Sequence, residues 1–374
     1  MVGLVAMCVA CSDTDTGKDI EETLYDDSSS AALANTDSDS DAVTDSDTPP
    51  LCSMQTSWED DQLNDVQDRY VRADDTSSDI KGNLNNQHLV VRPVTMPTAH
   101  PILHLHLGGS GGRPRNCSNI STVAAKAGFR SINLAYMNED SISAQCANPK
   151  TGKPYSDDCA EHVREEVLYG TDASPWVSVA RTDSIEYRLI KLLEWLAIHD
   201  KDGQWNDFLT ADGPAYDHMM VSGFSQGGGM AGMLSRDHSL DRSIFFSKGV
   251  DAVGSTLKDI QPAPWHLDTF ATPGDRMYGI VHREELAYFY SPVAFAAWGM
   301  SAFGDFIDAD NVQPPFDCTH QLSTGLTPAS ATPGTPNEFV QAHASIGVNV
   351  HQPTGPDGRP AMASAWHYFF TVDR

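Results

Sequence analysis

The stretch Met219-Met-Val-Ser-Gly-Phe-Ser-Gln-Gly-Gly-Gly-Met230 decides how the rest of the chain is interpreted. Apolar residues lead into a Gly-x-Ser-x-Gly motif centred on Ser225, and small residues follow it. This pattern predicts a strand, a tight turn that carries the serine, and then a helix. Gly223 and Gly227 lack a Cβ, so the strand and the helix can approach closely. A serine at a helix N-terminus lies where backbone N–H groups can stabilise a negatively charged oxygen. We therefore interpret Ser225 as a nucleophile rather than as a serine without a catalytic role in a glycine-rich turn.

The length and the net charge of the chain limit which kinds of protein it can be. At 374 residues it can bury one large core or two modest ones. The formal net charge of −27 argues against nucleic acid and anionic lipid as partners. Much of this charge lies in residues 12–50, which are mainly Asp, Ser, Thr and Ala. Such a segment cannot offset its ordering entropy by burial, so we expect a disordered acidic linker.

The first eleven residues, Met-Val-Gly-Leu-Val-Ala-Met-Cys-Val-Ala-Cys11, are apolar, small and end in cysteine. They resemble the end of a bacterial lipoprotein signal peptide, with Cys11 as the candidate lipid-bearing residue. The segment lacks the basic region and the full hydrophobic run of such a signal. No other stretch approaches the roughly 18 apolar residues of a membrane-spanning helix. We expect an exported protein, extracellular or periplasmic, which touches a membrane only through a lipid anchor.

Cysteine usage is consistent with export. Five cysteines follow the acidic linker, and no Cys-x-x-Cys spacing suggests zinc or redox chemistry. Cys146 and Cys159 flank a polar loop, so a local disulfide between them is predicted. A pairing of Cys52 with Cys117 is a guess without support from spacing. Because five is an odd number, at least one thiol lies outside any disulfide.

Strands that alternate with helices predict a mostly parallel α/β sheet. Residues 51–87 are polar and acidic and are interpreted as an irregular lead-in to a domain spanning 88–374. Residues 138–178 are expected to form a cap-like insertion. The predicted helices cover 122–128, 183–196 with Asp183 or Ser184 as its cap, and 361–370. Besides the strand before Ser225, the predicted strands cover 88–94, 101–107, 129–136, 243–247, 276–281 and 320–324.

The order of the motifs resembles the α/β-hydrolase superfamily, and most closely its secreted bacterial lipases and esterases. A glycine-rich loop at 108–112 follows an early strand, the Gly-Phe-Ser-Gln-Gly elbow comes next, and acid and histidine candidates follow. The resemblance covers roughly His88 to Arg374. It implies a sheet flanked by helices, a triad in the order serine, acid, histidine, and no metal or organic cofactor.

The resemblance places the histidine after the last strand and in a loop, from which it can take the serine proton. His343 meets both conditions and is the first candidate. His351 remains an alternative. His367 lies in the apolar terminal helix and is interpreted as a packed side chain, though it stays a candidate.

The acid must orient that histidine and stay ionised. In the superfamily it usually follows the second strand after the elbow, which points to Glu285 and, as second choice, Glu284. Asp251, one strand earlier, is the position that some lipase branches use. A solvated pair of glutamates at a helix N-terminus is the alternative interpretation of Glu284 and Glu285.

The oxyanion hole needs two donors aimed at the developing charge. The resemblance assigns the first to the backbone amide of Gln226 and the second to Gly109 or Ser110. These residues together predict a serine hydrolase that works through an acyl-enzyme, and the resemblance implies that its substrates are carboxylic esters rather than amides. Two alternatives stay open: a non-catalytic surface lipoprotein that uses this fold to bind a partner, and a depolymerase of an extracellular polyester.

Overall fold

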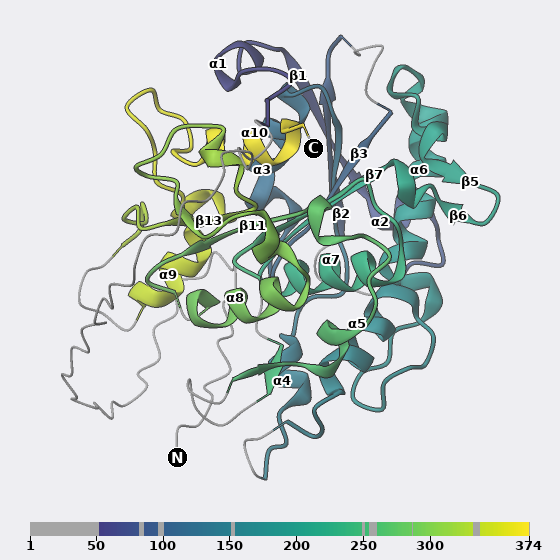
Figure 1. Cartoon of the computed structure of the whole chain (residues 1–374). Coiled ribbons are helices and arrows are strands. Elements are labelled where there is room, and N and C mark those ends of the chain that lie inside the picture. The colour runs from purple at the N-terminus through teal and green to yellow at the C-terminus, as the bar shows by residue number, and fades with distance from the viewer. Residues whose placement is uncertain are drawn as a thin grey trace. The chain divides into compact units, whose positions relative to one another are not determined.

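A computed structural model of the chain describes residues 52–81, 86–95, 101–150, 154–248, 251–253, 260–285, 287–331 and 337–373 (Figure 1). The signal-like segment ending at Cys11 and the acidic linker at 12–50 lie outside the described residues. Among the helices that are described, none is both long enough and apolar enough to cross a bilayer.

A sheet forms the centre of the domain (Figure 1). It has nine strands in the order β1-β2-β4-β3-β7-β8-β11-β13-β12. β1 pairs antiparallel with β2, and β2 pairs antiparallel with β4. The other neighbouring strands pair in parallel, with Leu105 opposite Val221 in the pair β3–β7. The strands are β1 Val66–Arg72, β2 Gln87–Pro93, β3 Leu103–Leu107, β4 Arg130–Leu134, β7 Met219–Phe224, β8 Arg242–Phe246, β11 Met277–His282, β12 Ile307–Asp308 and β13 Gln321–Thr324. This strand order is that of the α/β-hydrolase fold, which confirms the predicted fold class.

Two short antiparallel pairs lie outside this sheet: β5 Leu209–Thr210 with β6 Gly213–Pro214, and β9 Ala252–Val253 with β10 Gln261–Pro262. The helices are α1 Trp58–Asp61, α2 Ala73–Thr76, α3 Ser118–Lys126, α4 Ile142–Cys146, α5 Cys159–Tyr169, α6 Ile185–His199, α7 Gln226–Asp237, α8 Ala287–Ala297, α9 Glu338–Ser345 and α10 Ala363–Thr371. Ser184 caps α6, because its Oγ accepts the backbone N–H of Tyr187 at 3.3 Å.

Successive side chains of the central strands enter two separate cores, as the period of a strand requires. Met219 and Val221 of β7 pack in the core that α5, α6 and α7 cover. Met220, which lies between these two residues, and Phe224, the last residue of β7, pack in the other core with α3 and α10. The central strands are therefore buried on both faces, which is why β7 and β11 are nearly continuous apolar runs.

The predicted irregular lead-in at 51–87 is wrong for residues 66–72, which form the edge strand β1. Five of its seven residues are exposed and only Val71 is buried, so the strand carries the charged residues that edge strands tolerate. Its sequence therefore has no apolar alternation that would indicate a strand. The neighbouring predicted strands agree with β2, β3, β4, β8, β11 and β13 to within two residues at most ends.

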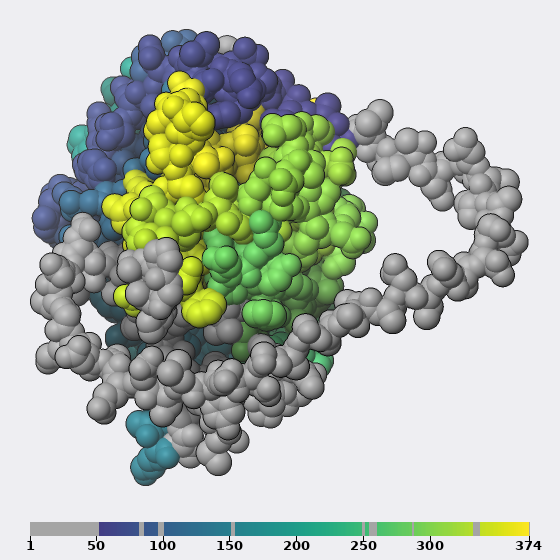
Figure 2. All heavy atoms as spheres, turned by 90° about the vertical axis from the view of Figure 1, so that its left-hand side faces the viewer, coloured from purple at the N-terminus to yellow at the C-terminus, as the bar shows by residue number. Residues whose placement is uncertain are grey.

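Two disulfides are present among the described cysteines, Cys146–Cys159 and Cys52–Cys318. The first confirms the predicted local pair. The guess of Cys52 with Cys117 is wrong, because Cys52 is bonded to Cys318; Cys117 is buried and takes part in neither disulfide. The first described segment runs beside the last one, with Met54 bridged to Val372. The last segment in turn contacts the region of Cys318, because Tyr368 donates to the carbonyl oxygen of Thr319. Figure 2 shows these N-terminal residues in purple beside the yellow C-terminal residues.

The segment 138–178, expected as a cap, contains α4 and α5. α5 contacts α6 and α7 and buries Val163, Val167 and Leu168 in the core. This helix is thus part of the layer that covers the sheet, and whether the segment also caps the site stays a prediction.

Candidate active site

Ser225 occupies the turn between β7 and α7, with φ 54° and ψ −117°. A serine at positive φ is strained by about 1–3 kcal/mol, and such strain concentrates at functional sites. Its backbone N–H donates to the carbonyl oxygen of Phe246 on β8 at 2.9 Å. The predicted strand, turn and helix are all present, and the serine lies in the turn itself.

The two glycines of the motif are required by close backbone contacts. A Cβ on Gly223 would lie 2.0 Å from the carbonyl oxygen of Gly227. A Cβ on Gly227 would lie 2.0 Å from the carbonyl oxygen of Leu107, at the end of the adjacent strand β3. No side chain fits at either position, which is the steric reason expected from the motif.

Glu285 follows β11 by three residues and is buried, with 1% of its surface exposed. Its Oε1 accepts two hydrogen bonds, from Ser247 Oγ at 2.5 Å and from the backbone N–H of His282 at 2.8 Å. Its Oε2 is hydrogen-bonded to Nδ1 of His343. The carboxylate is thus held in one orientation, with one oxygen fixed by the protein and the other aimed at an imidazole.

His343 lies on helix α9, not in the loop that was expected. The helix presents its imidazole to Glu285 and against the ring of Phe224, at 5.0 Å between ring centroids. Its side chain is 12% exposed, so the ring keeps a face toward solvent. A helix suffices here because the imidazole needs only to be placed beside the elbow, and Phe224 directly precedes Ser225.

Within the described residues, no hydrogen bond joins Ser225 Oγ to His343. Hydrogen bonds between catalytic side chains are often long in ligand-free structures and tighten when substrate binds. What the structure brings together is a strained serine and a carboxylate–imidazole pair whose imidazole packs against Phe224, the residue before that serine. These are the parts of a base-activated nucleophile.

The other two candidate histidines are engaged elsewhere. His351, in the 3₁₀ helix Asn349–His351, is hydrogen-bonded through Nδ1 to Ser330 Oγ. His367 on α10 is buried and its Nε2 is 2.8 Å from Asp61 Oδ2. Burial lowers the pKa of both imidazoles.

The two alternative acids are also placed apart from His343. Glu284 is exposed, and its backbone N–H donates to His282 Nδ1 at 3.1 Å. Asp251 is buried and faces Arg164 in a two-pronged ion pair, at 2.7 and 2.8 Å. Of the candidates, only Glu285 is bonded to His343.

The glycine-rich loop after β3 passes directly beside Ser225. A Cβ on Gly109 would lie 3.1 Å from Cβ of Ser225. Two side chains hold the loop: Tyr136 donates to the carbonyl oxygen of Gly108 at 2.6 Å, and Asn138 Nδ2 donates to that of Gly109 at 2.6 Å. These two bonds fix the carbonyl oxygens of the loop, which leaves its backbone N–H groups available as donors near the serine.

Ser110 and Gln226, both named as oxyanion candidates, contact each other. Ser110 Oγ donates to Gln226 Oε1 at 2.6 Å, and both side chains are buried. The backbone of Gln226 begins α7, so its N–H is one of the free donors of the helix N-terminus. This bond ties the glycine-rich loop to the elbow helix.

Sequence reasoning missed Tyr136, Asn138 and Ser247. Each follows the end of a parallel strand, β4 or β8, by one to four residues. Because the carboxyl ends of parallel strands meet at one edge of a sheet, and ligands bind there, position alone could have indicated them.

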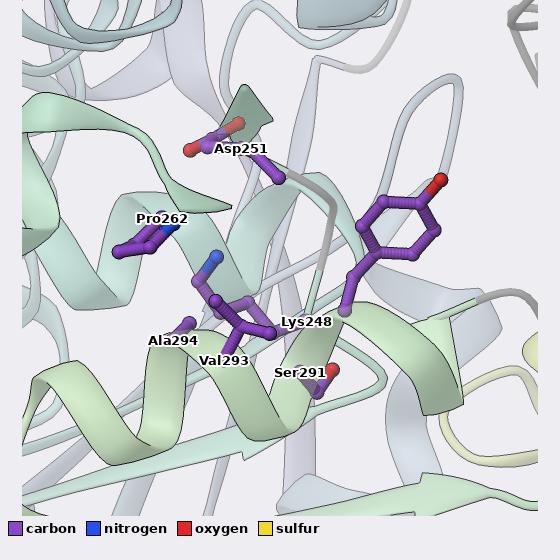
Figure 3. Close-up of a pocket in the computed structure, with 8 residues that line it drawn as sticks. Lys248, Asp251, Pro262, Ser291, Val293 and Ala294 are labelled. Carbon is purple, nitrogen blue, oxygen red and sulfur yellow. The ribbon is translucent and has the colours of Figure 1, made fainter. Parts of the chain in front are cut away.

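A cluster of charges lies behind the elbow, around a small cavity of about 10 Å³. Figure 3 shows Lys248, Asp251 and Ser291 around it. Burial lowers the pKa of Lys248 from 10.5 to about 7, against the attraction of Asp251. Burial alone would raise the pKa of Asp251, but Arg164 and Lys248 outweigh it and lower the value to about 2. A cavity of this volume has room for about one water molecule.

In the part of the chain that the structure describes, no three His, Cys, Asp or Glu side chains group as metal ligands would. The absence of a cofactor stays an expectation.

The chain matches no protein-family model and no curated protein. Among solved structures it is similar to a Klebsiella pneumoniae protein named as a dienelactone hydrolase, with 11% identity over 76% of this chain and 98% of that one and a TM-score of 0.37. It is also similar to esterase B of Lactobacillus rhamnosis, with 13% identity over 75% of this chain and 84% of that one and a TM-score of 0.33. A third is a thermostable esterase of Pseudomonas putida, with 12% identity over 85% and 84% of the two chains and a TM-score of 0.35.

The fold class rests on features of the chain itself. They are the strand order, the antiparallel β2, and the strained turn after β7. On these observations the chain has the α/β-hydrolase fold.

Proposed function

We propose that the protein is a serine hydrolase that cleaves carboxylic esters, with Ser225 as nucleophile, His343 as base and Glu285 as acid. The observation that carries this proposal is the bond between the buried Glu285 and the partly buried His343, whose ring packs against Phe224, the residue before the strained Ser225. A buried carboxylate bonded to Nδ1 fixes the tautomer in which Nε2 can accept a proton.

The reaction proceeds by acyl transfer to the serine. Ser225 Oγ attacks the ester carbonyl carbon while His343 takes its proton, and Glu285 stabilises the imidazolium. The tetrahedral intermediate collapses, the alcohol leaves with the proton from His343, and an acyl-enzyme remains. Water then repeats the sequence and releases the acid, so the enzyme returns to its starting state.

The negative oxygen of the intermediate is held by the backbone N–H of Gln226 and by one from Gly109 or Ser110. The position of Gly109 beside Ser225 and the bond from Ser110 to Gln226 support this assignment. Loss of one such donor typically costs about 3 kcal/mol of transition-state stabilisation.

Hydrolysis of short p-nitrophenyl esters tests the proposal. Ser225→Ala, His343→Ala and Glu285→Gln should each lower kcat by about 10³-fold or more with the fold intact by circular dichroism. His351→Ala is the matched control, and its kcat should stay within about twofold of the wild type, since its ring is bonded away from the site. A folded wild type that hydrolyses no ester would instead favour the non-catalytic surface protein.

Two exposed aromatic side chains favour a second candidate, a depolymerase of an extracellular polyester. Phe339 lies one helical turn before His343 on α9 and is 56% exposed, and Phe289 on α8 follows Glu285 by four residues and is 54% exposed. Exposed aromatic rings beside a site suit an apolar solid surface. Phe289→Ala with Phe339→Ala should lower the rate on insoluble polyester and leave soluble esters unaffected. Ile198→Ala, on α6 and 67% exposed, is the control.

The two disulfides support the proposal that the protein works in an oxidising compartment outside the cytoplasm. Attachment through lipidated Cys11 is part of the same proposal. Incorporation of labelled palmitate into the wild type and not into Cys11→Ser would test it.

A further inference from the structure

Arg164 on α5 lies buried beneath the start of the elbow helix, with 2% of its surface exposed. Among the described residues, its guanidinium makes three hydrogen bonds. Nε and Nη2 donate to the two carboxylate oxygens of Asp251 at 2.7 and 2.8 Å. Nη1 donates to the backbone carbonyl oxygen of Gln226 at 2.9 Å. The third bond therefore reaches the residue whose N–H is proposed to hold the oxyanion.

We propose that Arg164 is a positioning residue for the oxyanion hole, and that Asp251 serves to hold Arg164. A guanidinium presents its donors in a rigid plane, so two bonds to Asp251 fix the direction of the third. With its carbonyl oxygen bonded to Arg164, the backbone of Gln226 is restrained from rotating, and its N–H keeps its aim toward the oxyanion that forms when the substrate carbonyl carbon bonds to Ser225.

The glycines after the serine support this assignment. The elbow itself needs Gly227, but it does not explain Gly229. A Cβ on Gly229 would lie 2.2 Å from Cζ of Arg164 and 2.3 Å from its Nη2. The absence of a side chain at Gly229 is what lets the guanidinium reach the first turn of α7.

The groups around Asp251 explain why this carboxylate is not bonded to His343. Besides Arg164, the buried carboxylate faces Lys248 and lies 4.0 Å from Nε2 of His266. Replacing a buried ion pair by apolar residues of similar volume is often neutral or stabilising, so stability alone is a weak reason for this pair. The bond from Arg164 to Gln226 gives the ion pair a role in positioning the oxyanion hole.

This inference rests on the proposed function, and ester hydrolysis by the wild type is the first arm of its test. Arg164→Lys keeps the positive charge beside Asp251, but a single amine cannot serve both Asp251 and Gln226 with the geometry of the fork. We expect its kcat to fall about 10- to 100-fold, the range for a displaced catalytic group, with KM within about twofold. The kcat of Arg164→Met should fall further.

Arg236→Met is the matched control. Arg236 Nη1 is 2.7 Å from Glu161 Oε1, so this arginine also ties α7 to α5, but at the other end of α7 from Ser225. A variant that only loosens the two helices should leave kcat within about twofold of the wild type.

Inhibition by a trifluoromethyl ketone separates positioning from a structural role, because this transition-state analogue forms an oxyanion on Ser225. Its Ki should rise in Arg164→Lys by the same factor as KM/kcat, while the thermal midpoint of that variant changes little. Unchanged kcat and Ki in Arg164→Lys, or an equal loss in Arg236→Met, would overturn the positioning role and leave the proposed function intact. An inactive, folded wild type would overturn both.

Discussion

Replacing Lys248 by methionine should make the stability of the protein less dependent on pH. Lys248 is 2% exposed, and its Nζ lies 5.1 Å from the centre of the Trp298 ring and 5.9 Å from that of Trp265. Methionine has nearly the same length and carries no charge. The comparison therefore isolates the cost of holding an ammonium group in this environment.

The magnitude follows from the pKa of the buried amine. Burial lowers it from 10.5 to about 7. Between these values the unfolded chain binds more protons than the folded protein, so the free energy of unfolding rises with pH across this window. At about 1.4 kcal/mol for each pH unit, the difference amounts to about 5 kcal/mol. The advantage of Lys248→Met should be largest at pH 7 and below, and should shrink as the pH approaches 10.5.

Urea titrations followed by tryptophan fluorescence at several pH values from 6 to 10 measure this difference. Lys191→Met is the control, because Lys191 on α6 is partly exposed and its pKa is raised by a hydrogen bond from its amine to Glu194. Its difference from the wild type should stay flat up to about pH 10. A difference between Lys248→Met and the wild type that is also flat would refute the reasoning.

Three further predictions concern stability. Ser247→Ala removes the hydroxyl that donates to the buried Glu285 at 2.5 Å, so the free energy of unfolding should fall by about 2 kcal/mol in urea titrations; an unchanged value would contradict it. Replacing both Cys146 and Cys159 by serine opens a link between residues 13 apart and should cost about 3 kcal/mol, seen as a lower melting temperature, whereas equal melting would show that the bond does not stabilise. Burial lowers the pKa of His106 to about 3, so stability should be lost as the pH falls from about 6.5 toward 3, and His106→Phe should show a shallower loss in acid titrations; equal slopes would speak against this cause.

The parts of the site that could be predicted from sequence are those that depend on local requirements. The elbow needs Gly223 and Gly227 because the backbones touch there, and this requirement leaves a motif of five residues. Strands β7 and β11 have residues in the cores on both faces of the sheet, so they are visible in the sequence as mostly apolar runs. Glu285 and His343 were reached through the order of motifs in a resembling superfamily.

The remaining contacts join residues that are distant in sequence. Arg164 bonds Asp251, 87 residues away, and Cys52 pairs with Cys318, 266 residues away. The spacing of residues in the sequence does not predict such pairs, because it is the folded sheet that brings the two residues together. The edge strand β1 was missed for the opposite reason, since its exposed charged face hides the period of a strand.

Labelling with a fluorophosphonate probe, located by peptide mass spectrometry, tests the central assignment most directly. The account predicts a single labelled residue, Ser225, with no label in Ser225→Ala. It also predicts labelling slowed by about 10³-fold or more in His343→Ala and unchanged in His351→Ala. A folded wild type that takes no label at Ser225, or a His343→Ala variant that reacts at the wild-type rate, would contradict it.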